Sequence, residues 1–150
     1  MNSKSSRYLT YFLGSSMSYI AFLLIIVAFP LIQNNYGDLG FSYLVVTFYG
    51  IPFVYITTLL AYVSYFVVRR FFPSWKLSVH VIVCALLFNV LFAYGLFEDS
   101  ALSQLLVAIV GGAAAFLIGT KARKSVGTYL GIALPVLNLV GVLLAAYMMK

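Results

Sequence analysis

The chain has 150 residues, of which 64% are hydrophobic and 8% charged, and its mean hydropathy is +1.08. Soluble domains average about 25% charged residues, so this composition excludes an ordinary water-soluble domain. A membrane-spanning helix needs about 20 apolar residues, so the chain has room for about five spans and no second domain. We predict a single all-α integral membrane domain over residues 1–150.

Five apolar stretches separated by short polar breaks form the predicted bundle of transmembrane helices. In chain order they cover about residues 8–32, 41–68, 77–97, 101–120 and 126–149. The first is too long for the apolar region of a signal peptide and lacks a small-x-small cleavage site before the polar break, so we expect it to be retained. Pro52 and Pro135 lie inside the second and fifth stretches, where a missing backbone donor predicts a kink.

The charges predict the orientation of these spans. Of the nine Lys and Arg residues, all except Lys150 lie in breaks on one side of the membrane, and the three acids lie on the opposite side. Because basic loops stay in the cytoplasm, we expect a cytoplasmic N-terminus and an external C-terminus in the cell (inner or plasma) membrane. The net charge of +6 is then explained by orientation and by contact of the basic loops with anionic lipid, and no nucleic-acid partner is expected.

Chemically active side chains are scarce in the predicted spans. None contains Asp or Glu, and the motifs of metalloproteases, phosphate-binding loops and dinucleotide sites are absent from the sequence. His80 is expected to be an interfacial aromatic residue with a polar tip, with a pH-sensitive switch as the alternative. The single cysteine, Cys84, is expected to be a buried structural thiol. We predict no enzymatic activity, no metal site and no cofactor.

Uncharged amides stand within three spans, at Asn89, Gln104 and Asn138. An amide in lipid needs a partner, so each should face another helix or a wet cavity, and Asn89 and Asn138 are at depths at which they could meet. We favour hydrogen bonds between helices over the alternative, the lining of a path for a small polar solute.

The second span carries hydroxyl groups at Tyr55, Thr58, Tyr62 and Tyr65, which share one helical face. Tyr55 and Tyr62 should hydrogen-bond inside the bundle. With the kink at Pro52 they could also shape a pocket for an apolar or amphipathic ligand, although core packing is the preferred interpretation.

Small residues recur every four positions in the last two spans. They are Gly111, Ala115 and Gly119 in the fourth span, and Gly127 and Gly131 in the fifth. Because small residues let helix backbones approach closely, we expect the two spans to pair as a tight antiparallel hairpin.

Two segments carry a resemblance. The stretch Tyr49-Gly50-Ile51-Pro52, under a serine-rich first span (Ser15, Ser16 and Ser18), resembles small uncharacterised multi-span membrane proteins of Bacillus-type bacteria. The turn at residues 119–124 is similar to two-helix modules of bacterial membrane proteins. The resemblance implies a bacterial inner membrane and no particular activity.

For function, the sequence favours a small accessory or regulatory membrane protein that acts through helix contacts. Its partners would be the lipid bilayer, another membrane protein or further copies of itself. The alternative is a transporter or channel subunit for a small neutral or amphipathic solute, built around Asn89, Asn138, Tyr55 and Tyr62.

Overall fold

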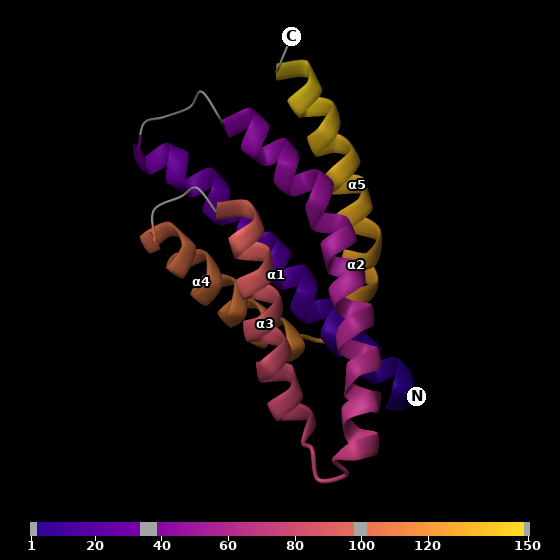
Figure 1. The fold of residues 1–150 in the computed structure, drawn as a ribbon. Coiled ribbons are helices and arrows are strands. Elements are labelled where there is room, and N and C mark those ends of the chain that lie inside the picture. Colours follow the sequence, from indigo (N-terminus) through magenta and orange to yellow (C-terminus); the bar gives the residue numbers. More distant parts are fainter. Residues whose placement is uncertain (1–2, 34–38, 98–101, 149–150) are drawn as a thin grey trace.

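The computed structural model describes residues 3–33, 39–97 and 102–148. Its helices are α1 (Ser3–Gln33), α2 (Leu39–Phe71), α3 (Leu77–Phe97), α4 (Leu102–Thr120) and α5 (Lys124–Met148) (Figure 1). Each contains a stretch long and apolar enough to cross a membrane. The all-α class is therefore confirmed, as is the prediction of five helices long and apolar enough to span a membrane. The acids Asp38, Glu98 and Asp99 and the terminal Lys150 lie outside the described residues.

Helix α1 is the centre of the bundle. It contacts all four other helices, and 50% of its apolar span is buried, against 17% for α5. Its middle carries Gly14, Ser15, Ser16 and Ser18, all buried. Within a membrane, small residues allow neighbouring backbones to approach closely, so this short segment is where other helices can come nearest to α1.

The closest of these approaches is between α1 and α4. A Cβ atom added to Gly119 would meet the backbone oxygen of Leu13, and one added to Gly14 would lie 2.9 Å from the Phe116 ring. At the contact of α1 with α2, a Cβ on Gly50 would collide with the ring of Tyr19. A side chain is thus excluded by the neighbouring backbone at Gly119, and by a packed aromatic ring at Gly14 and at Gly50.

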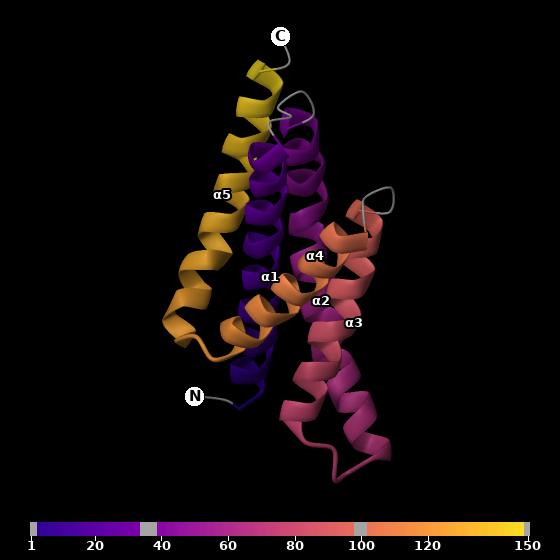
Figure 2. The same cartoon turned by 90° about the vertical axis from the view of Figure 1, so that its left-hand side faces the viewer.

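The predicted hairpin of the fourth and fifth spans is wrong. Figure 2 shows α4 and α5 diverging from their short connection, with α1 beside both, and the described residues of the two helices make no contact with each other. The small residues instead face α1: Gly111 lies against Ile25, and Gly127 against Leu9. Ala115 is half-buried on the same helix as Gly111. A small-residue pattern identifies a close approach, and the tertiary fold chooses its partner.

Neither internal proline ends its helix. Pro52 lies within α2 and Pro135 within α5, and both helices continue on either side. The loss of one backbone donor is therefore tolerated at each position, as is common where neighbouring helices support a membrane helix. The kinks proposed at these residues stay predictions.

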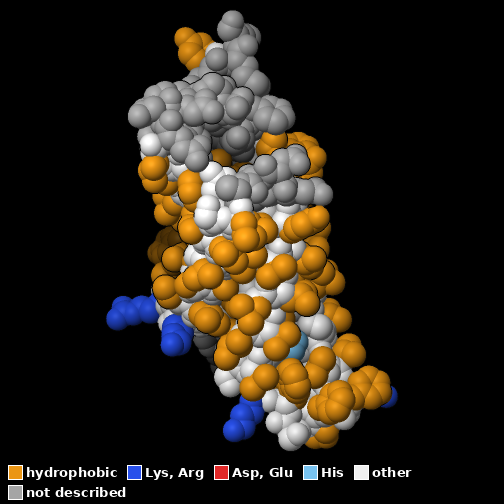
Figure 3. Space-filling model, turned by 60° about the vertical axis from the view of Figure 1, so that its left-hand side comes forward, with side chains coloured by type: hydrophobic (Ala, Val, Ile, Leu, Met, Phe, Trp, Pro, Cys, Tyr) orange, Lys and Arg blue, Asp and Glu red, His pale blue; other side chains and the backbone are white. Residues whose placement is uncertain are grey.

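The described basic side chains gather at one end of the bundle, here called the basic end. They are Arg7, Arg69, Arg70, Lys76, Lys121 and Arg123. Figure 3 shows Lys and Arg side chains toward one end, with a wide hydrophobic surface beyond them. A bundle with an apolar belt and charges at its margin matches a protein that spans a bilayer.

Candidate functional site

Three helices meet in a buried polar cluster in the half of the bundle nearest the basic end. Its members, called the His80 cluster, are Tyr11 of α1, Ser64 and Tyr65 of α2, and His80 and Cys84 of α3. Tyr11 is 0% and His80 4% exposed. Such side chains are costly in a membrane unless they satisfy one another, so their meeting point is the principal candidate site.

Both ring nitrogens of His80 have hydrogen-bond partners. The hydroxyl of Tyr11 lies 2.8 Å from Nδ1, and Oγ of Ser64 lies 3.2 Å from Nε2. The Sγ atom of Cys84, one helical turn further along α3, lies 3.4 Å from Nδ1. The imidazole therefore joins α1 and α2 to α3.

The hydrogen-bond directions select one tautomer of His80. Ser64 donates its hydroxyl proton to the carbonyl oxygen of Ala61, 3.2 Å away, so its oxygen is free to accept the proton of Nε2. Nδ1 then accepts from the Tyr11 hydroxyl. A neutral imidazole protonated at Nε2 satisfies these contacts together.

Tyr65 connects the cluster to the basic end. Its ring meets His80 edge-on with a centroid separation of 5.4 Å, and the Arg7 guanidinium carbon lies 5.4 Å from the centroid of the Tyr65 ring. Arg69 donates to the Tyr65 hydroxyl over 3.3 Å. Tyr65 thus contacts both the arginines of the basic end and the buried imidazole of His80.

The structure adds burial to the prediction that His80 is an interfacial aromatic residue, and its depth in the membrane stays a prediction. The residue lies in the core and is enclosed by side chains from three helices. The signal missed in the sequence is the spacing of four between His80 and Cys84, which places both on one face of a helix. Tyr11 and Ser64 lie too far away in sequence for any local pattern to identify them as partners. Cys84 is buried, as expected.

A second group of polar contacts lies further from the basic end than the His80 cluster. It joins Ser15 and Ser18 of α1 to Thr57 of α2 and Gly112 of α4. Ser18 donates to the backbone oxygen of Gly112 over 2.8 Å, which ties α1 to α4. The hydroxyl oxygens of Thr57 and Ser15 lie within hydrogen-bond distance, 3.0 Å apart, which ties α2 to α1. The expectation that the amides hydrogen-bond between helices is not met at Asn89, whose amide nitrogen donates within α3 to the oxygen of Ala85 over 2.6 Å.

The carbonyl oxygen of Asn89 has a distinctive environment. Its residue is 0% exposed, and Oδ1 has no hydrogen-bond partner among the described residues. A Cβ on Gly112 would collide with this oxygen, so the hydrogen atoms of the Gly112 Cα are its neighbours. A weak Cα–H···O contact between α3 and α4 is the interaction that this geometry permits.

The residues predicted to line a solute path do not share one lining. Helices α3 and α5 make no contact within the described residues, so Asn89 and Asn138 do not meet. Asn138 has a buried oxygen without a described partner, and Gln104 is half-buried on α4. Tyr55 is 38% exposed and lies beside Phe12, whereas the Tyr62 ring packs edge-on against Tyr8.

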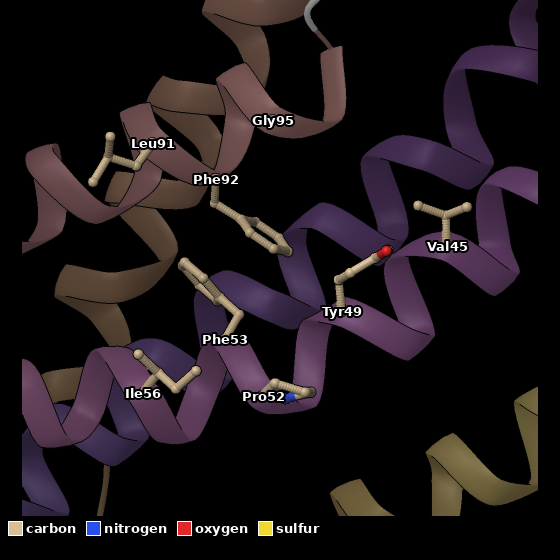
Figure 4. Close-up of a pocket in the computed structure, with 8 residues that line it drawn as sticks. All are labelled: Val45, Tyr49, Pro52, Phe53, Ile56, Leu91, Phe92 and Gly95. Atoms are coloured by element: carbon tan, nitrogen blue, oxygen red, sulfur yellow. The ribbon is translucent and has the colours of Figure 1, made fainter.

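A cavity of about 490 Å³ lies between α2 and α3, in the half of the bundle away from the basic end. Its lining is Val45, Tyr49, Pro52, Phe53, Ile56, Leu91, Phe92 and Gly95. Figure 4 shows the Phe53 and Phe92 rings next to each other between the two helices, and their centroids are 3.9 Å apart. A pocket at Pro52 was the alternative to core packing in the sequence analysis; Pro52 does line this cavity, but with Tyr49 and Phe53 in place of Tyr55 and Tyr62.

The His80 cluster and the α2–α3 cavity offer few groups for metal binding or catalysis among the described residues. Within residues 3–33, 39–97 and 102–148, no three His, Cys, Asp or Glu side chains lie close enough to hold a metal ion. His80 and Cys84 form a pair within reach of each other, but both are buried against neighbouring helices. The cluster is therefore best suited to holding α1, α2 and α3 in one arrangement.

No protein-family model, curated protein or solved structure matches this chain. We therefore infer the function of this chain from the contacts within its own structure.

Proposed function

We propose that this protein is a small accessory or regulatory membrane subunit that acts through helix–helix contacts with a membrane partner. It performs no catalysis in this proposal. The interior polar groups of α1, α2 and α3 hold the bundle together, and the binding surface is on its outside.

The observation that carries the proposal is the position of α5. This helix packs on α1 and α2 along one face and diverges from α4, so it is the least buried of the five spans. Its outer face presents Ile132, Val136 and Leu139, which are 67%, 56% and 64% exposed. A helix that contacts its own bundle on one side leaves its other side available to a partner helix.

Affinity purification of the tagged protein from its native membrane in mild detergent, with the mass of the intact complex, tests this proposal. A foreign subunit in fixed stoichiometry is expected. The double substitution Ile132→Ala with Leu139→Ala should release it, whereas Leu86→Ala with Leu87→Ala on the exposed face of α3 should retain it. Recovery of the chain without a foreign subunit would contradict the proposal.

A solute path is the second candidate function. It is favoured by two buried oxygens in the mid-bundle region, Ser16 Oγ and Asn89 Oδ1, which have no hydrogen-bond partner among the described residues. Solute flux into liposomes that is lost with Asn89→Leu, while the fold is retained, would favour this function over the first.

We infer a cytoplasmic basic end from the positive-inside rule, in a plasma or bacterial inner membrane. The six described basic side chains at that end also supply a surface for anionic lipid, worth about 1 kcal/mol for each basic residue near the headgroups. Weaker binding to anionic vesicles after Arg70→Gln and Lys121→Gln is the expected result.

A further inference from the structure

We propose that the cavity between α2 and α3 binds one acyl chain of a membrane lipid, from the leaflet on the side away from the basic end. This proposal is independent of the accessory function, because it concerns a different face of the bundle.

The place of the cavity determines what medium can fill it. All its lining residues belong to the apolar stretches Val45–Phe71 of α2 and Leu77–Gly95 of α3. The surroundings of these stretches in a bilayer are hydrocarbon, so the occupant enters from the lipid. None of the lining side chains is charged, and the Tyr49 hydroxyl is the only polar side-chain group among them. The lining therefore suits a hydrocarbon chain and offers nothing to bind a headgroup.

The length of the cavity matches a single leaflet. From Val45 to Ile56 the lining follows α2 for about 16 Å at 1.5 Å per residue. Half of a hydrocarbon core about 30 Å thick is about 15 Å. A single acyl chain extends over this depth, and the volume of about 490 Å³ is within the usual range for ligand pockets.

The aromatic side chains give the cavity a continuous apolar wall. The Phe53 and Phe92 rings stack with their centroids 3.9 Å apart and join α2 to α3. A flexible chain can lie along the aromatic surfaces.

Gly95 supplies the last observation. Most described glycines have a neighbour that would crowd a Cβ atom, and even Gly131 would have the Phe12 ring at 3.9 Å. Gly95, which lines the cavity, has no atom of the described residues within 4 Å of that position. Glycine within a helix costs about 1 kcal/mol relative to alanine, and no close contact among the described residues requires it here. Its missing side chain leaves room for an occupant against the α3 backbone.

Photolabelling in lipid nanodiscs tests the assignment. The probe is a phosphatidylcholine with a diazirine in the middle of one acyl chain, and labelled peptides are mapped by mass spectrometry. Labelling is expected to concentrate on residues 45–56 and 91–95, several-fold above the exposed residues Ile132, Val136 and Leu139 of α5. A diazirine in the headgroup should give no such enrichment.

Gly95→Leu fills the cavity and should lower labelling at Phe53 and Phe92 several-fold. Ala114→Leu, a similar enlargement on an exposed face of α4, should leave it unchanged. Leu91→Trp fills the same cavity from the previous turn and replaces Gly95→Leu if that variant fails to fold. Even labelling of α2, α3 and α5, or full labelling in the filled variant, would overturn the proposal. Cross-links joining residues 91–95 of two copies would overturn it in favour of a second copy of the chain.

Discussion

A single histidine holds three helices together at the residue scale. Its two ring nitrogens contact Tyr11 of α1 and Ser64 of α2, while its own helix supplies Cys84. Hydrogen bonds between membrane helices average about 0.6 kcal/mol and reach about 1.7, so the two interhelical bonds of His80 together contribute modestly to stability. Their larger effect is specificity, because a shifted helix would leave polar groups unsatisfied in lipid.

Replacement of Tyr11 by Phe removes the donor to His80 Nδ1 and keeps the ring. We expect the free energy of unfolding to fall by about 0.6–1.7 kcal/mol, the range for a hydrogen bond between membrane helices. Denaturation of the purified protein in mixed micelles measures this change. Tyr55→Phe is the control, because that ring is 38% exposed beside Phe12 and its loss of a hydroxyl should have little effect. Equal effects of the two substitutions would argue against the hydrogen bond.

Substitution of Gly119 by Ala tests the close approach of α4 to α1. The new Cβ would meet the backbone oxygen of Leu13, which cannot move without shifting α1. We expect a loss of about 1–3 kcal/mol, as for other insertions into packed cores, measured by the same denaturation experiment. Gly131→Ala has the Phe12 ring at 3.9 Å, an ordinary contact, and should be neutral or stabilising by up to about 1 kcal/mol, because alanine is the better helix former. The interpretation fails if Gly119→Ala is tolerated as well as Gly131→Ala.

At the scale of helices, α1 decides the arrangement. Its small residues admit α4, and the Ser18 hydroxyl bonds to the Gly112 carbonyl oxygen at the same crossing. Helix α5 reaches α1 through Gly127 and Gly131. Helices α4 and α5 are adjacent in sequence but both pack on α1, because the small residues of each lie against α1 side chains or backbone.

Cross-linking distinguishes this arrangement from a hairpin. In a Cys84→Ala background, the pair Ile25→Cys with Gly111→Cys should form a disulfide on mild oxidation, because these residues face each other between α1 and α4. The pair Ala115→Cys with Gly131→Cys should remain free, because the described residues of α4 and α5 make no contact. The mobility of each double-cysteine variant on a non-reducing gel shows whether its disulfide has formed. A disulfide in the second pair would support the hairpin and contradict the fold.

For the whole molecule, the distribution of charge predicts how the bundle sits in a membrane. The described basic side chains lie at one end, and the surface beyond them is apolar (Figure 3). The acids Asp38, Glu98 and Asp99 lie outside the described residues. Orientation therefore depends on the positive-inside rule applied to the sequence.

Labelling of single cysteines in intact cells tests the orientation. In the Cys84→Ala background, Asp38→Cys should react with an impermeant maleimide, and Ala122→Cys should react only after the membrane is permeabilised. The reason is the preference of basic loops for the cytoplasm. Reaction at position 122 in intact cells would reverse the proposed orientation.

The sequence by itself determined the helical class, the number of spans and their approximate boundaries. A backbone in lipid must satisfy its own hydrogen bonds, so every apolar stretch of sufficient length becomes a helix, whatever its neighbours are. It also marked Gly111, Gly119 and Gly127 as places of close approach, because small residues admit another backbone.

Only the tertiary structure decided which helices meet. Lipid is as apolar as the side chains of these helices, so hydrophobicity does not distinguish an inward face from an outward one. Sparse long-range contacts make that choice, such as Tyr11 with His80 across 69 residues and Ser18 with Gly112 across 94. For this reason local sequence patterns could not predict the His80 cluster, the separation of α4 from α5 or the α2–α3 cavity. The spacing of His80 and Cys84 indicated only that these two members of the His80 cluster share a helix face.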